Sequence, residues 1–252
     1  MASAVSGFSS CLIWNYRKVL ESLTISGPSQ SRDTVEVTSH DSPDGFREYA
    51  AGIVAGGEVS LDGNLIVGDT GGQIAFHTDV QGGTKRYGFV VMPMAVGGSL
   101  FFSAIATGFG TEFPFDSKIG VTGSLTVSGK PLLLNTQSTG LSTPFLSGKE
   151  TNTGGDALTI LPETKAANVY AYTCAVGSGI AAVVLTVTAE DPTDHIVYVQ
   201  GELEAEGVET AAIALGAEGT TTDILIIVHE GTATVPTKSP RLYILKATRA
   251  AA

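Results

Sequence analysis

Short apolar or alternating runs recur along the whole chain, and turn-forming residues separate them. Alternation with a period of two is typical of a half-buried strand. In Thr34–Thr38, for example, Val35 and Val37 share one side and the polar residues share the other. The pattern therefore predicts an all-β protein. In the first half the predicted strands are Cys11–Tyr16, Glu21–Ile25, Thr34–Thr38, Gly57–Leu65, Arg86–Met92, Leu100–Gly108 and Ile119–Ser128.

The second half repeats this pattern with short runs and closely spaced turns, which is typical of a β-sandwich. The predicted strands are Val169–Val176, Ala181–Ala189, His195–Leu203, Thr210–Leu215, Thr222–Val228 and Leu242–Ala247. An immunoglobulin-like topology is one option for this half, but no motif in it fixes the topology.

Two long uncharged stretches, Tyr87–Thr111 and Ala166–Ala189, have a length that could span a membrane. Each is interrupted near its middle, the first by Pro93 and Gly97 and the second by the Gly177–Gly179 turn. We interpret each stretch as two strands joined by a glycine turn, and we expect no membrane association.

Only two segments have helical signals. Ser42, Pro43 and Asp44 form a helix-start signature that predicts a helix continuing through Tyr49 and Ala50. A second helix is predicted over Gln73–Gln81, with Gly82 and Gly83 as its stop signal.

The length of 252 residues favours two domains. Between residues 135 and 156 the composition changes to Asn, Thr, Ser and Gly, which is typical of a linker. We therefore predict a first β-sandwich domain over residues 1–134, a linker over 135–156 and a C-terminal β-sandwich domain over 157–252.

The formal net charge is −11, and both halves are acidic. A protein that grips DNA through its phosphates needs clustered Lys and Arg, so specific DNA binding is disfavoured. The first residues lack the basic and apolar pattern of a secretory signal. We expect a protein that is made and used in a cytosol.

Residue patterns for chemistry are weak. The Gly177–Gly179 turn precedes a strand rather than the helix that a dinucleotide site needs. The four His are scattered without metal-ligand spacing, and Cys11 and Cys174 lie in apolar runs that predict inert buried thiols. We expect no enzymatic activity, no cofactor and no metal.

A cluster of charged and polar residues between positions 32 and 48 has two interpretations. It is a contact loop, or it is a solvated edge without a partner. His40, Asp41 and Ser42 have the residue types of a hydrolase triad, but neighbours in sequence rarely meet in triad geometry. The candidate contact residues are Arg32, Asp33, Glu36, His40, Asp41, Ser42, Asp44, Arg47 and Glu48.

Several ordered segments resemble a long-tailed bacteriophage (siphophage) tail tube, or major tail, protein. The resemblance begins with the strand Arg32–Thr38, then Ser39–Gly45 and an aromatic turn over Phe46–Tyr49. A strand opening at Gly56–Val59 follows, then a helix that ends at Gly82–Thr84 and a strand that opens at Lys85–Tyr87. The segment Val127–Pro131 closes the match, which covers residues 20–131, whereas Cys11–Lys18 departs from the Gly-rich start of the family.

The resemblance implies a β-sandwich with one flanking helix, in a subunit that forms hexameric rings. Such rings stack into a hollow virion tail, assembled in the host cytoplasm, through which DNA passes without specific binding. It implies the chain itself, a tape-measure protein and tail tip or terminator proteins as partners. It also favours the contact-loop interpretation of residues 32–48, and it places the C-terminal domain outside the tube.

Two alternatives remain open from the sequence. The same tube could belong to a gene-transfer particle or a bacteriocin. The chain could instead be a surface-binding module with two β-sandwiches, which a signal peptide, sequons or disulfides would favour.

Overall fold

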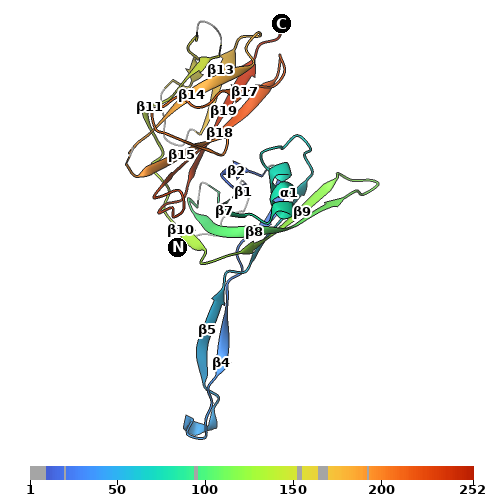
Figure 1. Cartoon of the computed structure of the whole chain (residues 1–252), viewed down its shortest axis with the longest axis vertical. Helices are drawn as coiled ribbons and strands as arrows, with labels where there is room; N and C mark the ends of the chain where they lie inside the picture. Colours follow the sequence, from blue (N-terminus) through green and yellow to red (C-terminus); the bar gives the residue numbers. More distant parts are fainter. Residues whose placement is uncertain (1–9, 20, 94–95, 152–154, 164–169, 192) are drawn as a thin grey trace.

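The computed structural model of the 252-residue chain describes residues 10–19, 21–93, 96–151, 155–163, 170–191 and 193–252. Strands dominate, and three parts follow one another along the longest axis in Figure 1: a C-terminal β-sandwich, an N-terminal domain with helix α1 (Gln73–Gly82), and a long hairpin. The predicted all-β class is thus confirmed. Within the described residues, no helix is long and apolar enough to cross a bilayer.

The N-terminal domain is built on one antiparallel sheet with the order β2-β1-β7-β8-β9-β6-β3, and β10 pairs with β8. The predicted β7–β8 hairpin within Tyr87–Thr111 is present, with Val91 opposite Ser99. The strands are β1 (Cys11–Trp14), β2 (Arg17–Lys18), β3 (Ser22–Ser26), β6 (Glu58–Asn64), β7 (Lys85–Val91), β8 (Ser99–Glu112), β9 (Gly120–Val127) and β10 (Leu132–Leu134).

Helix α1 packs against one face of this sheet. Phe76 is 1% exposed and meets the edge of the Trp14 ring at a centroid distance of 5.8 Å. The Trp14 indole N–H donates to Asp79 at 2.8 Å. Asp69 caps the helix, because its carboxylate accepts the backbone N–H groups of Gly72 and Gln73 at 3.0 and 2.8 Å. The predicted helix over Gln73–Gln81 is confirmed, and Gly83 ends it with φ 62°.

The other predicted helix was wrong. Its start signal yields one 3-10 turn, η1 (Pro43–Gly45), after which the chain enters strand β5 (Tyr49–Ala55). Asp44 and Gly45 adopt φ 54° and 73°, so the backbone leaves the right-handed helical region after one turn. Strand β4 (Ser31–Glu36) then supplies hydrogen-bond partners for β5 in a separate two-stranded sheet.

The C-terminal half is a sandwich of a three-stranded sheet and a six-stranded sheet, with Leu185, Ile226 and Tyr243 in the core between them. The first sheet has the order β11-β14-β17 and the second β12-β13-β19-β18-β15-β16. The strands are β11 (Leu141–Glu150), β12 (Ile160–Leu161), β13 (Ala171–Val176), β14 (Ala182–Ala189), β15 (His195–Val199), β16 (Glu202–Glu204), β17 (Ile213–Ala214), β18 (Thr221–Glu230) and β19 (Arg241–Arg249).

Two sequence predictions about this half need correction. The segment 135–156, predicted as a linker, contains β11, which pairs with β14 and belongs to the sandwich. The Gly177–Gly179 turn does not close a hairpin, because β13 and β14 lie in different sheets. The first segment, rich in small polar residues, forms an ordered strand, and the glycine turn connects strands of two different sheets. Composition alone was therefore misleading in both places. Residues 152–154 of the predicted linker and 166–169 of the long uncharged stretch lie outside the described residues.

The chain between the halves is bound to the sandwich instead of hanging free. Two backbone hydrogen bonds hold it there. The Ser138 N–H donates to the Ser239 carbonyl at 2.9 Å, and the Ser239 N–H donates to the Thr136 carbonyl at 2.7 Å. The N–H of Leu141 donates to the Tyr243 hydroxyl at 3.2 Å. These bonds hold residues 136–141 against the C-terminal sandwich.

A third apolar core joins the two halves. It includes Ile13, Phe89 and Phe101 on the far side of the N-terminal sheet, and Tyr198 and Ile227 from the C-terminal sandwich. We call this cluster the interdomain core. Ile13, Phe89 and Ile227 are each 0% exposed. The halves therefore pack as one body, with the outer face of β1, β7 and β8 covered.

Candidate assembly surfaces

The hairpin of β4 and β5, which we call the arm (residues 31–55), projects away from the rest of the molecule (Figure 1). All six residues of β4 are exposed, and in β5 only Gly52 is partly covered. An isolated two-stranded hairpin is marginally stable in water because it has no core. The rest of the described chain therefore leaves the arm uncovered.

Local hydrogen bonds give the arm a defined shape. The Val37 N–H donates to the Glu48 carbonyl at 2.9 Å, and the Ser42 hydroxyl donates to the Glu48 carboxylate at 2.7 Å. The pairing of β4 and β5 shifts between Arg32 and Thr34. Gly52 lies opposite this irregularity, where a Cβ would approach the Asp33 carbonyl oxygen to 2.9 Å. A side chain at position 52 would push the strands apart.

The arm also exposes apolar side chains on both strands and at its tip. Ile53 is 82% exposed and Phe46 is 73% exposed. Contiguous exposed apolar surface on a soluble protein marks an interaction site. The other large apolar side chains exposed on the arm are Val35, Val37, Tyr49 and Val54.

All nine predicted contact residues lie on the arm, although the structure joins only some of them. Arg47 pairs with Glu36 at 3.5 Å, and Ser42 bonds Glu48. Arg32 donates to the Gly52 carbonyl at 3.4 Å. Asp33, His40, Asp41 and Asp44 are exposed around the bulge and the tip. Their role as contacts stays a prediction. Sequence reasoning named the charges and missed the exposed apolar residues, which the alternation of β4 had indicated.

A second surface lies on the outer side of β3, β6, β9 and the end of β8. Residues directly opposite each other on antiparallel strands share a face, and here Glu58 pairs with Thr126, Ser60 with Ser124 and Asp62 with Thr122. Burial along β6 alternates, with Val59 and Leu61 inside. We call this surface the hydroxyl face: Thr24, Ser26, Glu58, Ser60, Asp62, Thr107, Thr122, Ser124 and Thr126.

The hydroxyl face has small polar side chains, two carboxylates and no Lys or Arg among its defining residues. Thr107 and Ser124 lie within hydrogen-bond distance at 3.2 Å, and a shallow hollow of about 380 Å³ spans Ser60, Asp62 and Thr122. Such a surface offers little apolar contact and repels phosphate. Sequence reasoning did not identify this face, although the alternation of Glu58, Ser60 and Asp62 was available as a signal.

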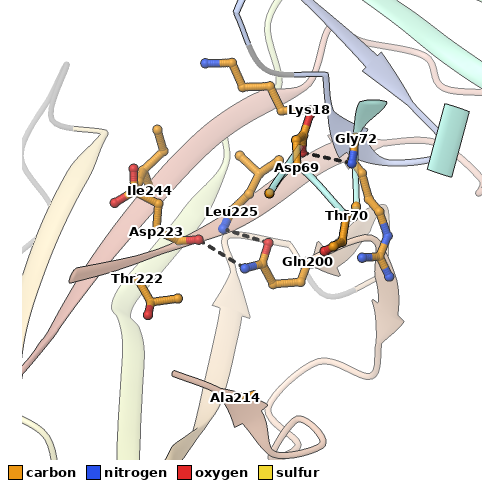
Figure 2. Close-up of a pocket in the computed structure, with 13 residues that line it drawn as sticks. Lys18, Asp69, Thr70, Gly72, Gln200, Ala214, Thr222, Asp223, Leu225 and Ile244 are labelled. Carbon is orange, nitrogen blue, oxygen red and sulfur yellow. Dashed lines mark hydrogen bonds between the residues drawn. The ribbon is translucent and has the colours of Figure 1, made fainter. Parts of the chain in front are cut away.

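An interdomain cleft of about 600 Å³ lies between the loop before α1 and the C-terminal sandwich. Figure 2 shows the Gln200 side chain donating to the Asp223 carbonyl at 3.1 Å and accepting from the Leu225 N–H at 3.4 Å. Arg17, at its mouth, bonds Glu202 at 2.9 Å. These polar groups are paired across or beside the cleft, so the cleft serves the junction of the domains.

The titratable groups of the C-terminal sandwich cluster near the same junction. His229 is fully buried and stacks near Tyr16 and Tyr198 at 6.0 and 5.9 Å. Burial lowers the pKa of His229. Burial alone would raise the pKa of Glu230, but the hydrogen bonds and charge of Lys238, with the Thr139 N–H, lower it overall. These groups stabilise the fold near the junction.

The thiols and histidines give no catalytic arrangement in the described chain. Cys11 and Cys174 are free and buried, as predicted, and burial raises the pKa of each thiol to about 11. Among the residues that the structure describes, no three His, Cys, Asp or Glu side chains gather as a metal site. Ser42 of the suspected triad bonds Glu48 on the exposed arm.

Comparisons with solved structures identify similar chains in phage-like particles. One is from the virion of a native gene transfer agent (GTA) particle, with 17% identity, coverage of 52% of this chain and 98% of that chain, and a TM-score of 0.44. Another is from the tail of an empty GTA particle with C6 symmetry, with 17% identity, coverage of 51% and 98%, and a TM-score of 0.44.

A third similar chain is from the sheath/tube terminator of an extracellular contractile injection system in its extended state. It has 14% identity, coverage of 52% of this chain and 97% of that chain, and a TM-score of 0.44. These are components of phage-like tail particles, the class of assembly that the sequence resemblance indicates. No family model and no curated protein matches the chain.

Proposed function

We propose that this chain is a structural subunit of a tail tube, in which copies form stacked rings around a conduit for DNA. The resemblance over residues 20–131 supports the siphophage type and hexameric rings. The role is mechanical and electrostatic and needs no catalytic step. The finished location is the virion tail, after assembly in the host cytoplasm.

The observation that carries the proposal is the arm. Its large apolar side chains, including Phe46 and Ile53, are exposed, and the hairpin that carries them projects beyond the domain core (Figure 1). A tube of stacked rings gives such an arm a neighbouring subunit to contact at every position. Burial of these side chains in an adjacent ring then supplies the cohesion between rings.

The hydroxyl face supports the conduit. The outer face of β1, β7 and β8 is covered by the C-terminal sandwich, so it is not free to line a lumen. The hydroxyl face is uncovered, with Glu58 and Asp62 as its charges. Placed toward the lumen, these carboxylates repel the DNA phosphates, and the short side chains leave the passage wide.

The remaining partners follow from the resemblance. A tape-measure protein would occupy the lumen during assembly, and tail tip and terminator proteins would close the two ends. DNA would pass without specific binding. By the resemblance, the C-terminal sandwich would lie toward the outside of the tube.

Deletion of the arm tests the proposal, because Ser31 and Ala55 are paired and an Asn-Gly turn can join the strands at that point. The wild-type chain at high concentration should form rings or tubes in negative-stain images and in sedimentation velocity. The deletion variant should keep the melting transition and remain monomeric. A control variant carrying Glu163→Lys, on the exposed surface of the C-terminal sandwich, should assemble as the wild type does.

Two results would count against the proposal. One is a wild-type chain that stays monomeric at every concentration and also when pre-formed tube ends are added as initiators. The other is tube formation that is unchanged without the arm.

A further inference from the structure

A second hairpin exposes aromatic residues that no segment of the described chain covers. The connection between β8 and β9 carries Phe113, Pro114 and Phe115, which we call the aromatic tip, and it projects from the side of the sheet in Figure 1. Phe113 is 70% exposed and Phe115 is fully exposed. Acidic side chains flank the tip at Glu112 and Asp116. Aromatic side chains in this position are characteristic of interface anchors.

A small apolar groove lies at the other end of the same strand. Its volume is about 200 Å³, and Val91, Met92 and Leu242 line it together with the Tyr170 ring. Two cations, Lys18 and Arg241, also line it. We call it the end groove. It lies where the N-terminal sheet meets the C-terminal sandwich, so its walls come from both halves.

The two features are separated by the length of β8. Val91 pairs with Ser99, the first residue of β8, whereas the aromatic tip follows Glu112, the last. A strand of 14 residues is roughly 45 Å long. The tip therefore cannot reach the end groove of its own chain, and the two face opposite ends of the sheet.

We propose that the aromatic tip of one copy inserts into the end groove of a second copy. The occupant is complementary in polarity and charge, because an aromatic segment between two carboxylates meets an apolar groove whose lining includes two cations. The two patches are different surfaces at opposite ends of one sheet, so the contact is heterologous. Repetition of a heterologous contact closes a ring or extends a helix.

This inference rests on the proposed function in one respect, since it takes the second copy to be the neighbour within a ring. It adds a contact distinct from the arm, which projects from another edge of the molecule. A groove of this size holds one aromatic ring, so the tip is an anchor within a larger interface. The arm would join rings, and the aromatic tip would join subunits within a ring.

Cysteine cross-linking tests the contact directly. In the variant M92C/F115C, a short bismaleimide should produce a ladder of covalent oligomers, because each link joins two different chains. The natural thiols are buried and should react slowly. The matched control M92C/V67C moves the second thiol to Val67, which is 75% exposed elsewhere on the N-terminal domain. It should give no ladder.

Assembly of tip variants gives the energetic test. F113S/F115S should raise the protein concentration needed for ring formation by more than roughly tenfold, as expected for loss of aromatic anchors. The matched control V67S should not change it. D116K and K18E should each weaken assembly, and the double variant D116K/K18E should recover part of the loss. Melting of the monomer should be unchanged in F113S/F115S.

The outcomes separate this inference from the proposed function. Normal rings in F113S/F115S, with no ladder from M92C/F115C, overturn the inference and leave the tube proposal standing. A ladder from a chain that never forms tubes supports the contact and contradicts the tube. Absence of the ladder, together with a wild-type chain that does not assemble even when pre-formed tube ends are added, overturns both.

Discussion

The arm exposes large apolar side chains, whereas the interdomain core buries side chains of the same kind. Phe46 on the arm is 73% exposed, whereas Phe89 in the interdomain core is 0% exposed. The difference is that β7 has sheet neighbours and a covering sandwich, whereas β4 and β5 have only each other. Apolar surface that the chain buries for itself stabilises the monomer, and the surface that it leaves exposed is available for a partner.

The largest expected effect comes from separating the two halves. A fragment of residues 1–134 loses the cover over Ile13, Phe89 and Phe101, which together form an apolar face on β1, β7 and β8. We expect the fragment to aggregate, because such a patch drives association in water. Solubility after expression and size-exclusion chromatography measure this directly.

The control is the same fragment carrying Phe89→Ser and Phe101→Ser, which should recover solubility if the exposed face is the cause. A wild-type fragment that is monomeric and melts as the full chain does would show that the interdomain core contributes little. The two halves would then be independent domains.

Two matched alanine substitutions, one in the interdomain core and one on the arm, compare the two regions at single side chains. Phe89→Ala should lower the free energy of unfolding by about 3–5 kcal/mol, as for other buried aromatic residues. Phe46→Ala should change it by less than about 0.5 kcal/mol, because the side chain is exposed in the monomer. Urea denaturation of both variants gives these values.

Assembly should respond in the reverse order. Phe46→Ala should impair tube formation although the monomer is intact, and Phe89→Ala should impair it only to the extent that the chain unfolds. Equal stability losses for the two variants would mean that the arm is packed in the monomer, contrary to its exposure.

Much of the fold could be predicted from local pattern, and the failures have a common cause. Helix α1 was predicted because Gly82 and Gly83 stop it and its interior is helix-compatible. Strand β5 was missed because the Ser42, Pro43 start signal is local, whereas β5 owes its existence to pairing with β4. Strand β11 was likewise missed in a Ser/Thr/Gly-rich segment that β14 holds in place.

The candidate surfaces also divide into those that local sequence reveals and those that depend on contacts between distant segments. The charges of the arm were visible as a cluster, so the segment was found. The hydroxyl face requires knowing that β6 and β9 are neighbours, which residues 58–64 and 120–127 do not reveal by themselves. The end groove depends on Met92 and Leu242 meeting across both halves. Contacts between distant segments are set by tertiary packing, and one sequence carries no direct record of them.

Acid should destabilise the packing at the junction of the two halves and leave the arm unaffected. His229 donates from Nδ1 to the Glu230 carbonyl at 3.2 Å, and its buried Nε2 has no hydrogen-bond partner in the described chain. Burial lowers the pKa of His229, so the unfolded chain binds its proton more readily. Stability is therefore full above the unfolded pKa of about 6.5 and falls as the pH drops below it.

Melting temperatures measured from pH 7.5 to pH 5 test this. His229→Phe preserves an aromatic ring beside Tyr16 and Tyr198 and should flatten the decline. His40→Gln, which removes an exposed imidazole on the arm, is the control and should follow the wild-type curve. A wild-type curve with no decline across this range would mean that protonation of His229 does not oppose folding.

The smallest effect on stability, and the most selective on function, is expected at the hydroxyl face. Glu58 and Asp62 have exposed side chains on β6, so E58K/D62K should change the free energy of unfolding by less than about 0.5 kcal/mol per substitution. The variant replaces two repelling charges by two that bind phosphate. Its affinity for DNA should rise. The logarithm of the binding constant should fall linearly with the logarithm of the salt concentration, with a slope of roughly −0.9 for each phosphate contacted.

E163K/D194K makes the same change in net charge on the C-terminal sandwich, and fluorescence anisotropy with a DNA duplex compares the two variants. If the hydroxyl face lines the conduit, assembled E58K/D62K tubes should retain DNA that wild-type and E163K/D194K tubes release at the same salt concentration. Equal retention by both variants would mean that net charge alone governs the interaction. In that case the lumen must be formed by another surface, because charges on the outside of a tube and charges lining it cannot act alike on a strand confined within.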